Sequence, residues 1–216
     1  GARLRSHTLQ KPGTLTYQQL AIWAGPEVPR FVPLTAGKSE LSLLDAIPGG
    51  YVALYREPYT SCSRLGTLAS GDLDWSNCEA EVRVFDCAGR ITASVPLHRY
   101  HKRPDHLEVQ DVRVDRGKLY FNEACITYSR EAGGRCSQLV AVDLNTRKEL
   151  WRTGYKTSNN VFVVVGDYII GGYGFTAEPS SVNVFRKSDG HLLHKKALKT
   201  RSFPGGNHDH LAGEAG

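Results

Sequence analysis

The feature that most constrains the fold of this 216-residue chain is a recurring pattern of short strand-like runs. In residues 107–153, four runs of alternating apolar and polar residues are separated by turns that contain Gly, Asp or Asn. Alternation over four to eight residues predicts half-buried β-strands, and self-similarity at a fixed period predicts a repeat architecture. The same order recurs before and after this stretch. We therefore expect three units of roughly 45 to 60 residues, each a four-stranded antiparallel meander.

The three units align by their first strands, which we predict at residues 41–45, 107–114 and 160–165. Residues 39–47 also fit a short helix on local pattern, but the repeat overrules that alternative. A four-stranded meander cannot bury both of its faces alone. We therefore expect the units to stack face to face, with their apolar side chains hidden between neighbouring sheets.

The N-terminal part of the chain is similar to the second half of such a unit. Residues 19–23 alternate like residues 138–142, and residues 30–34 follow as a second strand. The sequence therefore predicts an N-terminal segment with a half unit (1–38), three whole units (39–200) and a polar, Gly-rich tail (201–216).

An open stack of three and a half units exposes an apolar sheet face and strand edges at both ends. Such a chain is a piece of a larger ring, pairs with another chain to complete one, or makes a small open assembly. Two copies supply about seven units, which is within the usual ring sizes. We expect a protein partner or a second copy to complete the ring. Because the chain starts with Gly1 and contains no Met, we also expect a signal peptide, a longer parent chain or trimming behind it.

One segment carries a specific motif. From Ala141 onward it reads Ala-Val-Asp-Leu-Asn-Thr-Arg-Lys-Glu-Leu-Trp, which resembles the quinoprotein-type (PQQ-like) propeller repeat Ala-x-Asp-x-x-Thr-Gly-x-x-x-Trp. Asp143, Thr146 and Trp151 stand in register with that repeat, and Arg147 replaces its Gly. The resemblance implies an all-β partial β-propeller of about three and a half four-stranded antiparallel blades. It also implies that Asp143 and Thr146 set a turn and that Trp151 docks between adjacent blades.

The same resemblance bears on function. Quinoprotein dehydrogenases of this fold carry adjacent cysteines over the cofactor and acidic ligands to calcium, whereas this chain has no adjacent cysteines, so we expect no cofactor. Non-catalytic relatives use such blades as envelope scaffolds or as extracellular sensor and adhesion domains. We therefore expect a non-catalytic scaffold or structural subunit of a secreted or envelope assembly. A fragment of a quinoprotein-like oxidoreductase and a glycan- or small-ligand-binding module stay open as alternatives.

Four of the five cysteines hold equivalent places in two units. Cys62 and Cys125 each follow a predicted second strand, and Cys78 and Cys136 each precede a predicted third strand. We expect two local disulfides, Cys62–Cys78 and Cys125–Cys136, and therefore an oxidising compartment. Closing such a loop contributes roughly 3 kcal/mol in the chain-entropy model. Cys87 is left over in a turn, where an unpaired thiol is favoured over a link to another chain.

Two clusters of potential metal ligands have simpler structural explanations. Asp72, Asp74 and Asn77 carry oxygen atoms that suit calcium, but an Asx-rich turn inside a disulfide loop explains them better. His208 and His210 flank a carboxylate in a polar tail that has no further ligand nearby. No Gly-x-Ser-x-Gly, P-loop or dinucleotide pattern is present. We therefore expect no metal site and no catalytic residues.

The ends of the first strands are the expected place for a ligand, by analogy with other propellers, because they line the axis of the ring. The residues at these ends are Ser39, Glu40, Asp105, His106, Asn159 and Asn160. The net charge of +5 comes from scattered basic residues and does not indicate a nucleic-acid binder. No apolar run approaches the roughly 18 residues of a membrane-spanning helix.

Overall fold

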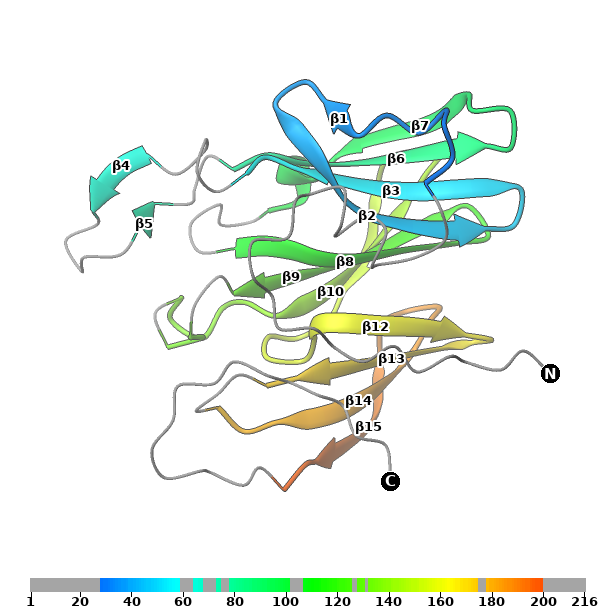
Figure 1. Cartoon of the computed structure of the whole chain (residues 1–216). Helices are drawn as coiled ribbons and strands as arrows, with labels where there is room; N and C mark the ends of the chain where they lie inside the picture. The colour runs from blue at the N-terminus through cyan, green and yellow to red at the C-terminus, as the bar shows by residue number, and fades with distance from the viewer. Residues whose placement is uncertain are drawn as a thin grey trace, which may run out of the picture.

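The computed structural model confirms an all-β fold of stacked antiparallel sheets (Figure 1). One short 3-10 turn, η1 (Leu97–Tyr100), interrupts the strands. No helix in the described part of the chain is long and apolar enough to cross a membrane. The structure describes residues 28–58, 64–67, 73–74, 78–101, 107–125, 128–130, 132–174 and 178–199.

The first sheet, which we call unit 1, has the strand order β1-β2-β3-β6-β7. A separate hairpin of β4 and β5 projects sideways between β3 and β6 (Figure 1). The segment with the alternative helical pattern is strand β2, as the repeat predicted. The bounds are β1 (Thr35–Ala36), β2 (Ser39–Ile47), β3 (Gly50–Arg56), β4 (Arg64–Thr67), β5 (Leu73–Asp74), β6 (Ala80–Asp86) and β7 (Ile91–Pro96).

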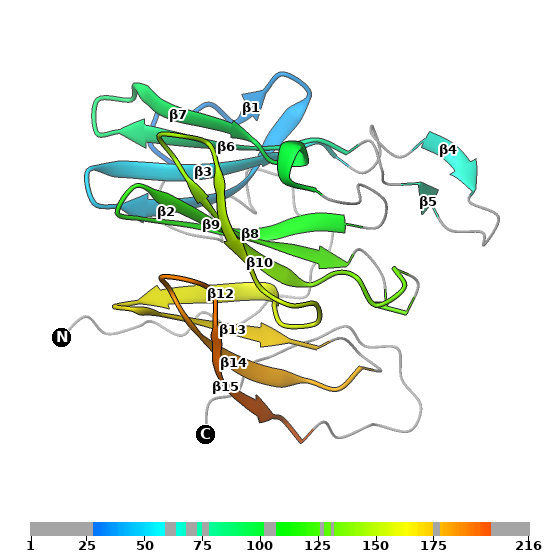
Figure 2. The same ribbon diagram turned by 180° about the vertical axis from the view of Figure 1, so that it is seen from behind.

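The second and third sheets, units 2 and 3, are four-stranded meanders, with orders β11-β10-β9-β8 and β12-β13-β14-β15. Figure 2 shows the η1 turn at the start of the connection from unit 1 to unit 2. Strands β2, β8 and β12 therefore begin three equivalent meanders. The bounds are β8 (Leu107–Asp115), β9 (Lys118–Cys125), β10 (Gln138–Asp143), β11 (Glu149–Arg152), β12 (Asn159–Val165), β13 (Tyr168–Tyr173), β14 (Ser181–Arg186) and β15 (Leu192–Ala197).

A register shift recurs near the start of each of these three strands. It falls between Leu41 and Leu43 in β2, between Val109 and Val112 in β8, and between Asn159 and Phe162 in β12. A β-bulge leaves residues out of the ladder and re-aims their backbone groups. The repeated bulge therefore frees backbone polar groups on the first strand of every meander. We call this strand the inner edge of its unit.

The apolar core lies between the sheets. One cluster joins units 1 and 2 and includes Val84 and Phe121, and a second joins units 2 and 3 and includes Tyr120 and Phe185. Tyr120 and Phe121 are neighbours on one strand, so their side chains point to opposite faces of unit 2. Unit 2 is therefore covered on both faces, as expected for the middle sheet of a stack.

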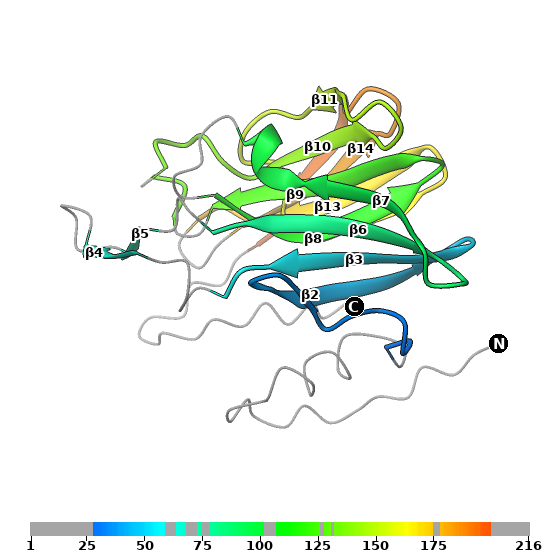
Figure 3. The ribbon, with the colours of Figure 1, turned by 90° about the horizontal axis from the view of Figure 1, so that it is seen from above.

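A third cluster lies on the face of unit 1 that points away from unit 2. There Val32, which is 3% exposed, packs with Tyr55 and Phe85, and Val28 and Leu34 lie against them. The segment 28–36 thus covers this outer face. Viewed from above, the chain ahead of β2 lies beside that strand (Figure 3).

The prediction of a strand at residues 30–34 is wrong. This stretch forms turns and bends, with the Val32 backbone N–H donating to the Pro29 carbonyl at 2.9 Å. Pro29 and Pro33 lack the N–H groups that a strand would contribute to a ladder. Residues 28–33 therefore cover unit 1 through side chains, and pairing with β2 begins where the Leu34 carbonyl accepts from the Leu41 N–H at 2.9 Å, just ahead of β1. The preceding residues 19–23 lie outside the described part.

Candidate functional site: the uncovered face of unit 3

The repeat motif forms the turn between β10 and β11. Asp143 Oδ1 accepts hydrogen bonds from the backbone N–H groups of Asn145 (3.0 Å) and Thr146 (2.7 Å) and from the Thr146 hydroxyl (3.0 Å). Hydrogen bonds from Thr146 lower the pKa of Asp143. Arg147, at the position of the family's Gly, has a φ of 61°. The turn therefore keeps the left-handed conformation of the repeat at the cost of steric strain.

Trp151 docks unit 2 onto unit 3. Its indole N–H donates to the Lys187 carbonyl at 3.2 Å, and its ring lies 5.8 Å from that of Tyr120 between centroids. A Cβ atom added to Gly190 would clash with the Trp151 ring. The indole thus packs flush on the turn between β14 and β15, which is the role that the resemblance implied.

The same kind of contact recurs at the boundary of units 1 and 2 and at the outer end of unit 1, where sequence reasoning did not find it. The Tyr100 hydroxyl donates to the Arg147 carbonyl at 2.9 Å, and a Cβ atom added to Gly89 would lie 2.7 Å from Phe31. Gly89, Arg147 and Gly190 all have positive φ, at 82°, 61° and 70°. Each turn before a fourth strand therefore receives one aromatic side chain from the segment that precedes its unit.

A polar seam joins units 2 and 3 at the inner edge. Asp111 Oδ2 accepts from the Phe162 backbone N–H at 2.9 Å, the Asn122 amide donates to the Asn160 carbonyl, and Gln110 Oε1 accepts from the Asn160 N–H at 2.6 Å. Asp111 is 1% exposed, and this burial raises its pKa to about 6. The sequence signal that was missed is a polar residue at an inward-facing position of an apolar strand.

A similar seam joins units 1 and 2. The Arg56 guanidinium donates to Ser42 Oγ at 2.7 Å and to the Val109 carbonyl at 3.2 Å. Ser42 and Val109 both border the bulges of their first strands. Because a guanidinium can satisfy two acceptors at once, Arg56 ties the two inner edges together. The bulges therefore serve the contact between units.

The predicted ligand-facing residues separate into different environments. Asn159 is buried, and its amide donates to the Gly174 carbonyl at 2.9 Å while its Oδ1 accepts from the Gly174 N–H at 3.2 Å. Asn160 is exposed, with a φ of 58°, and Glu40 is half-buried on β2. These contacts give Asn159 a bracing role inside unit 3. Ser39 is buried, and Asp105 and His106 lie outside the described residues.

The cysteines follow the repeat. Cys125 and Cys136 form a disulfide with their Cα atoms 5.3 Å apart, which closes the loop between β9 and β10. Cys78 is also in a disulfide, and its predicted partner Cys62 lies outside the described residues. Cys87 is free and exposed in the turn between β6 and β7.

The residues named as metal candidates fall mainly outside the described part. His208, His210, Asp72 and Asn77 are not described, and of Asp74 only the backbone, in β5, is. Within the described ranges, no group of three or more His, Cys, Asp or Glu residues could hold a metal ion.

A buried charged cluster lies at the boundary of units 1 and 2. Arg152 pairs with Glu123 and with Glu149, and it donates to the Tyr100 carbonyl at 2.6 Å. His101 Nδ1 lies 3.8 Å from Glu123 Oε1. Burial, aided by the charge of Arg152, lowers the pKa of His101 to about 4, so this imidazole is neutral at pH 7. The cluster anchors the connection between the two sheets.

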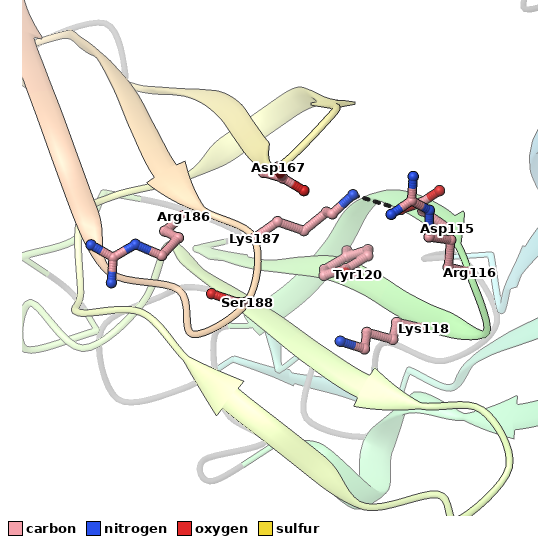
Figure 4. Close-up of a pocket in the computed structure, with 8 residues that line it drawn as sticks. All are labelled: Asp115, Arg116, Lys118, Tyr120, Asp167, Arg186, Lys187 and Ser188. Atoms are coloured by element: carbon pink, nitrogen blue, oxygen red, sulfur yellow. Dashed lines mark hydrogen bonds and ion pairs between the residues drawn. The ribbon is translucent and has the colours of Figure 1, made fainter.

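A pocket of about 370 Å³ lies where turns of units 2 and 3 meet (Figure 4). Lys187 reaches across it to Asp115 at 2.8 Å, whereas Arg186 points away and pairs with Asp189 at 2.8 Å. Burial raises the pKa of Tyr120 to about 12. The lining is charged, and its dominant contact is an ion pair between two units. The residues that line it are Asp115, Arg116, Lys118, Tyr120, Asp167, Arg186, Lys187 and Ser188.

The most distinctive surface is the face of unit 3 that points away from unit 2, which we call the open face. Ile169 and Phe185 pack toward unit 2, so their neighbours Ile170 and Val184 point the other way. Ile170 is 37% exposed and Val163, its partner on β12, is 44% exposed. The exposed apolar residues of this face are Val161, Val163, Val165, Tyr168, Ile170 and Val182.

The open face matches, position by position, the face that unit 2 buries. In unit 2 the paired row Tyr120, Ala141 and Trp151 packs against unit 3. When the turns before the fourth strands are aligned, the row at the same positions of unit 3 is Ile170, Val184 and His194. The open face thus carries apolar side chains at two of these three positions, and no sheet of the described residues lies upon it. Contiguous exposed apolar patches of this kind mark interaction sites.

These features define the class of protein as a partial β-propeller: three antiparallel meanders that stack face to face with recurrent turns and docking aromatics. No protein-family model matches the sequence, and no curated protein matches it either.

Among solved structures, the chain is similar to BamB from Moraxella catarrhalis, at 12% identity and a TM-score of 0.37, over 71% of this chain and 36% of that one. It is also similar to a europium-containing methanol dehydrogenase, at 12% identity and a TM-score of 0.40, over 74% of this chain and 27% of that one. The chain thus spans about a third of the first structure and about a quarter of the second.

Proposed function

We propose that this chain is a non-catalytic propeller module that serves as a protein–protein scaffold or structural subunit, and that it binds through the open face of unit 3. The observation that carries this proposal is that Ile170, at the position of buried Tyr120 in unit 2, lies beside Val163 in an exposed apolar row of unit 3. A protein partner or a second copy of the chain covers this face. Burying β-branched and aromatic side chains supplies the free energy of that contact.

The disulfides support a place for this assembly outside the reducing cytosol. Cys125–Cys136 and the disulfide of Cys78 form and persist in oxidising environments. We therefore place the assembly in a secreted or periplasmic, cell-envelope setting.

The proposal is tested by photo-crosslinking in the cells that produce the protein. A photoreactive amino acid at Ile170, in the middle of the open face, should give a specific crosslinked product. The same amino acid at Ile91, which is 51% exposed on β7 of unit 1, is the matched control. Equal yields at the two positions would show that the open face is not a binding surface. The mass of the product separates a second copy from another protein.

A further inference from the structure

The two ends of the stack differ in a way that limits what can cover the open face. The outer face of unit 1 is already occupied by residues 28–36, where Val32 is buried against Tyr55 and Phe85. A head-to-tail ring of two copies would press the open face of one copy against that occupied end. Each copy therefore has one apolar sheet face available among its described sheets, and it is the same face.

We propose that the open face pairs with the open face of a second copy, related by a two-fold axis, so that the assembly closes at two chains. This inference rests on the proposed function and names the occupant of its binding surface. An isologous contact uses the same patch on both partners and leaves no copy of it exposed. The result is a sandwich of the two unit 3 sheets and not a completed propeller ring.

The face has the size and shape for such a contact. Four strands about 4.8 Å apart and six residues long, at about 3.3 Å per residue, cover a plane of roughly 400 Å². Side chains add relief to this plane, so pairing two such faces buries roughly 1,000 Å² in total. That area is close to the roughly 1,000 Å² that a biological contact needs and falls among weak, reversible associations. Val163, Ile170 and Val182 form the middle of the contact.

The charges of strand β15 favour the face over the edge as the contact. Lys195 and Lys196 are exposed on this edge strand, and exposed lysines oppose strand-to-strand pairing of edges. Lys196 pairs with Val182 and therefore borders the open face. A two-fold axis parallel to the strands lays β15 of each copy over β12 of the other. The two lysine edges then lie about 14 Å apart across the sheet, and farther with the sheet spacing, beyond the screening length of about 8 Å.

Sedimentation of the whole 216-residue chain tests the pairing. We expect the wild-type protein to dimerise at about 1 mM and to dissociate on dilution, as a small, reversible interface implies. Val163→Lys puts a charge into the contact and should raise the dissociation constant at least tenfold, with an unchanged circular dichroism spectrum. Ile91→Lys, on exposed β7 of unit 1, should leave the dissociation constant unchanged. A chain that stays monomeric at about 1 mM overturns the proposal, as does a dimer that Val163→Lys does not weaken.

Cysteine crosslinking tests the symmetry. Ile170→Cys in a Cys87→Ser background places a single new thiol on the central strand β13, near the two-fold axis. Because facing sheets pack about 10 Å apart, beyond the reach of a direct disulfide, the thiols are joined with a short bismaleimide. We expect a covalent dimer, whereas a head-to-tail contact would leave this thiol unlinked. If Ile170 crosslinks to another protein and the wild-type chain is monomeric, the proposed pairing of two copies is wrong, but the proposed scaffold function is supported. No crosslink of either kind would overturn both.

Discussion

The two ends of this stack of sheets are built alike and finished differently. At the unit 1 end, residues 28–36 cover the outer face, and Val32 is 3% exposed. At the unit 3 end, the apolar row that contains Val163 and Ile170 stays in contact with solvent. The comparison teaches that apolar side chains on both faces of a sheet make both suited to burial, whereas only a neighbouring segment decides which face becomes core. The uncovered end is therefore where we propose that this module binds.

The largest expected effect compares Trp151 with His194, which occupy the same register position in units 2 and 3. Trp151→Ala should lower the free energy of unfolding by about 3 kcal/mol, because it removes a partly buried indole from the boundary of units 2 and 3. His194→Ala, on the open face, should change it by less than about 0.5 kcal/mol. Urea denaturation, at protein concentrations low enough to keep the chain monomeric, measures both changes in the free energy of unfolding. Leu150→Ala, on the exposed side of β11, is the control, and similar losses at both positions would contradict the comparison.

The second effect comes from the covered boundary between units 1 and 2. Burial, followed by the charges of Arg152 and His98, lowers the pKa of His101 from 6.5 to about 4. The folded state therefore binds this proton less readily than the unfolded state, so stability is full above pH 6.5 and is lost as the pH falls toward 4. The shift corresponds to about 3 kcal/mol. His101→Gln should flatten this part of the pH–stability curve, and an unchanged slope would mean that His101 does not cause it.

A third test exchanges Val for isosteric Thr at the two ends of the stack. Val32→Thr should lower the free energy of unfolding by about 2 kcal/mol, because it places a hydroxyl in the apolar layer that covers unit 1. Val163→Thr should change stability by less than about 0.5 kcal/mol in the monomer, because the hydroxyl meets water. Thermal unfolding at low protein concentration measures both. If the two variants lose equal stability, the two ends are equally covered.

The smallest effect concerns the turn that accepts Tyr100. Arg147→Gly should stabilise the chain by about 0.5 to 1 kcal/mol, because glycine relieves the left-handed φ of 61° and keeps the carbonyl that Tyr100 binds. Gly117→Ala is the converse control: its φ is 74°, and nothing lies within 4 Å of the added Cβ. Gly117→Ala should lower the free energy of unfolding by about 1 kcal/mol from backbone strain alone. Chemical denaturation of both variants checks that the first gains and the second loses free energy of unfolding.

Much of the fold follows from local pattern, as particular elements show. The first strands β8 and β12 lie where alternation placed them, and the turn of Asp143 and Thr146 forms the hydrogen bonds that its motif implies. Period-two alternation and Asx turns are properties of a few neighbouring residues. The same local reasoning failed at residues 30–34, which form turns and bends and contact unit 1 mainly through the side chains of Val32 and Leu34.

The candidate site was less accessible to such reasoning. In the inner seam, Asp111 bonds Phe162, which lies 51 residues further along the chain, and Asn122 bonds Asn160, which lies 38 residues further. No local motif marks either contact. Asn159, predicted from fold analogy to face a ligand, braces Gly174 instead. Contacts between units depend on where a bulge turns a backbone group, and this is set by the packed sheets.

The sequence by itself determined three antiparallel meanders, their turns and the pairing of Cys125 with Cys136, because each depends on residues close together in the chain. The tertiary structure alone decided which sheet faces are covered. Residues 28–36 conceal one end, and unit 2 conceals one face of each neighbour, while the face of unit 3 meets solvent. Apolar alternation marks a face as suited to burial, but coverage is a contact between distant segments, and the same pattern gives core at Tyr120 and surface at Ile170.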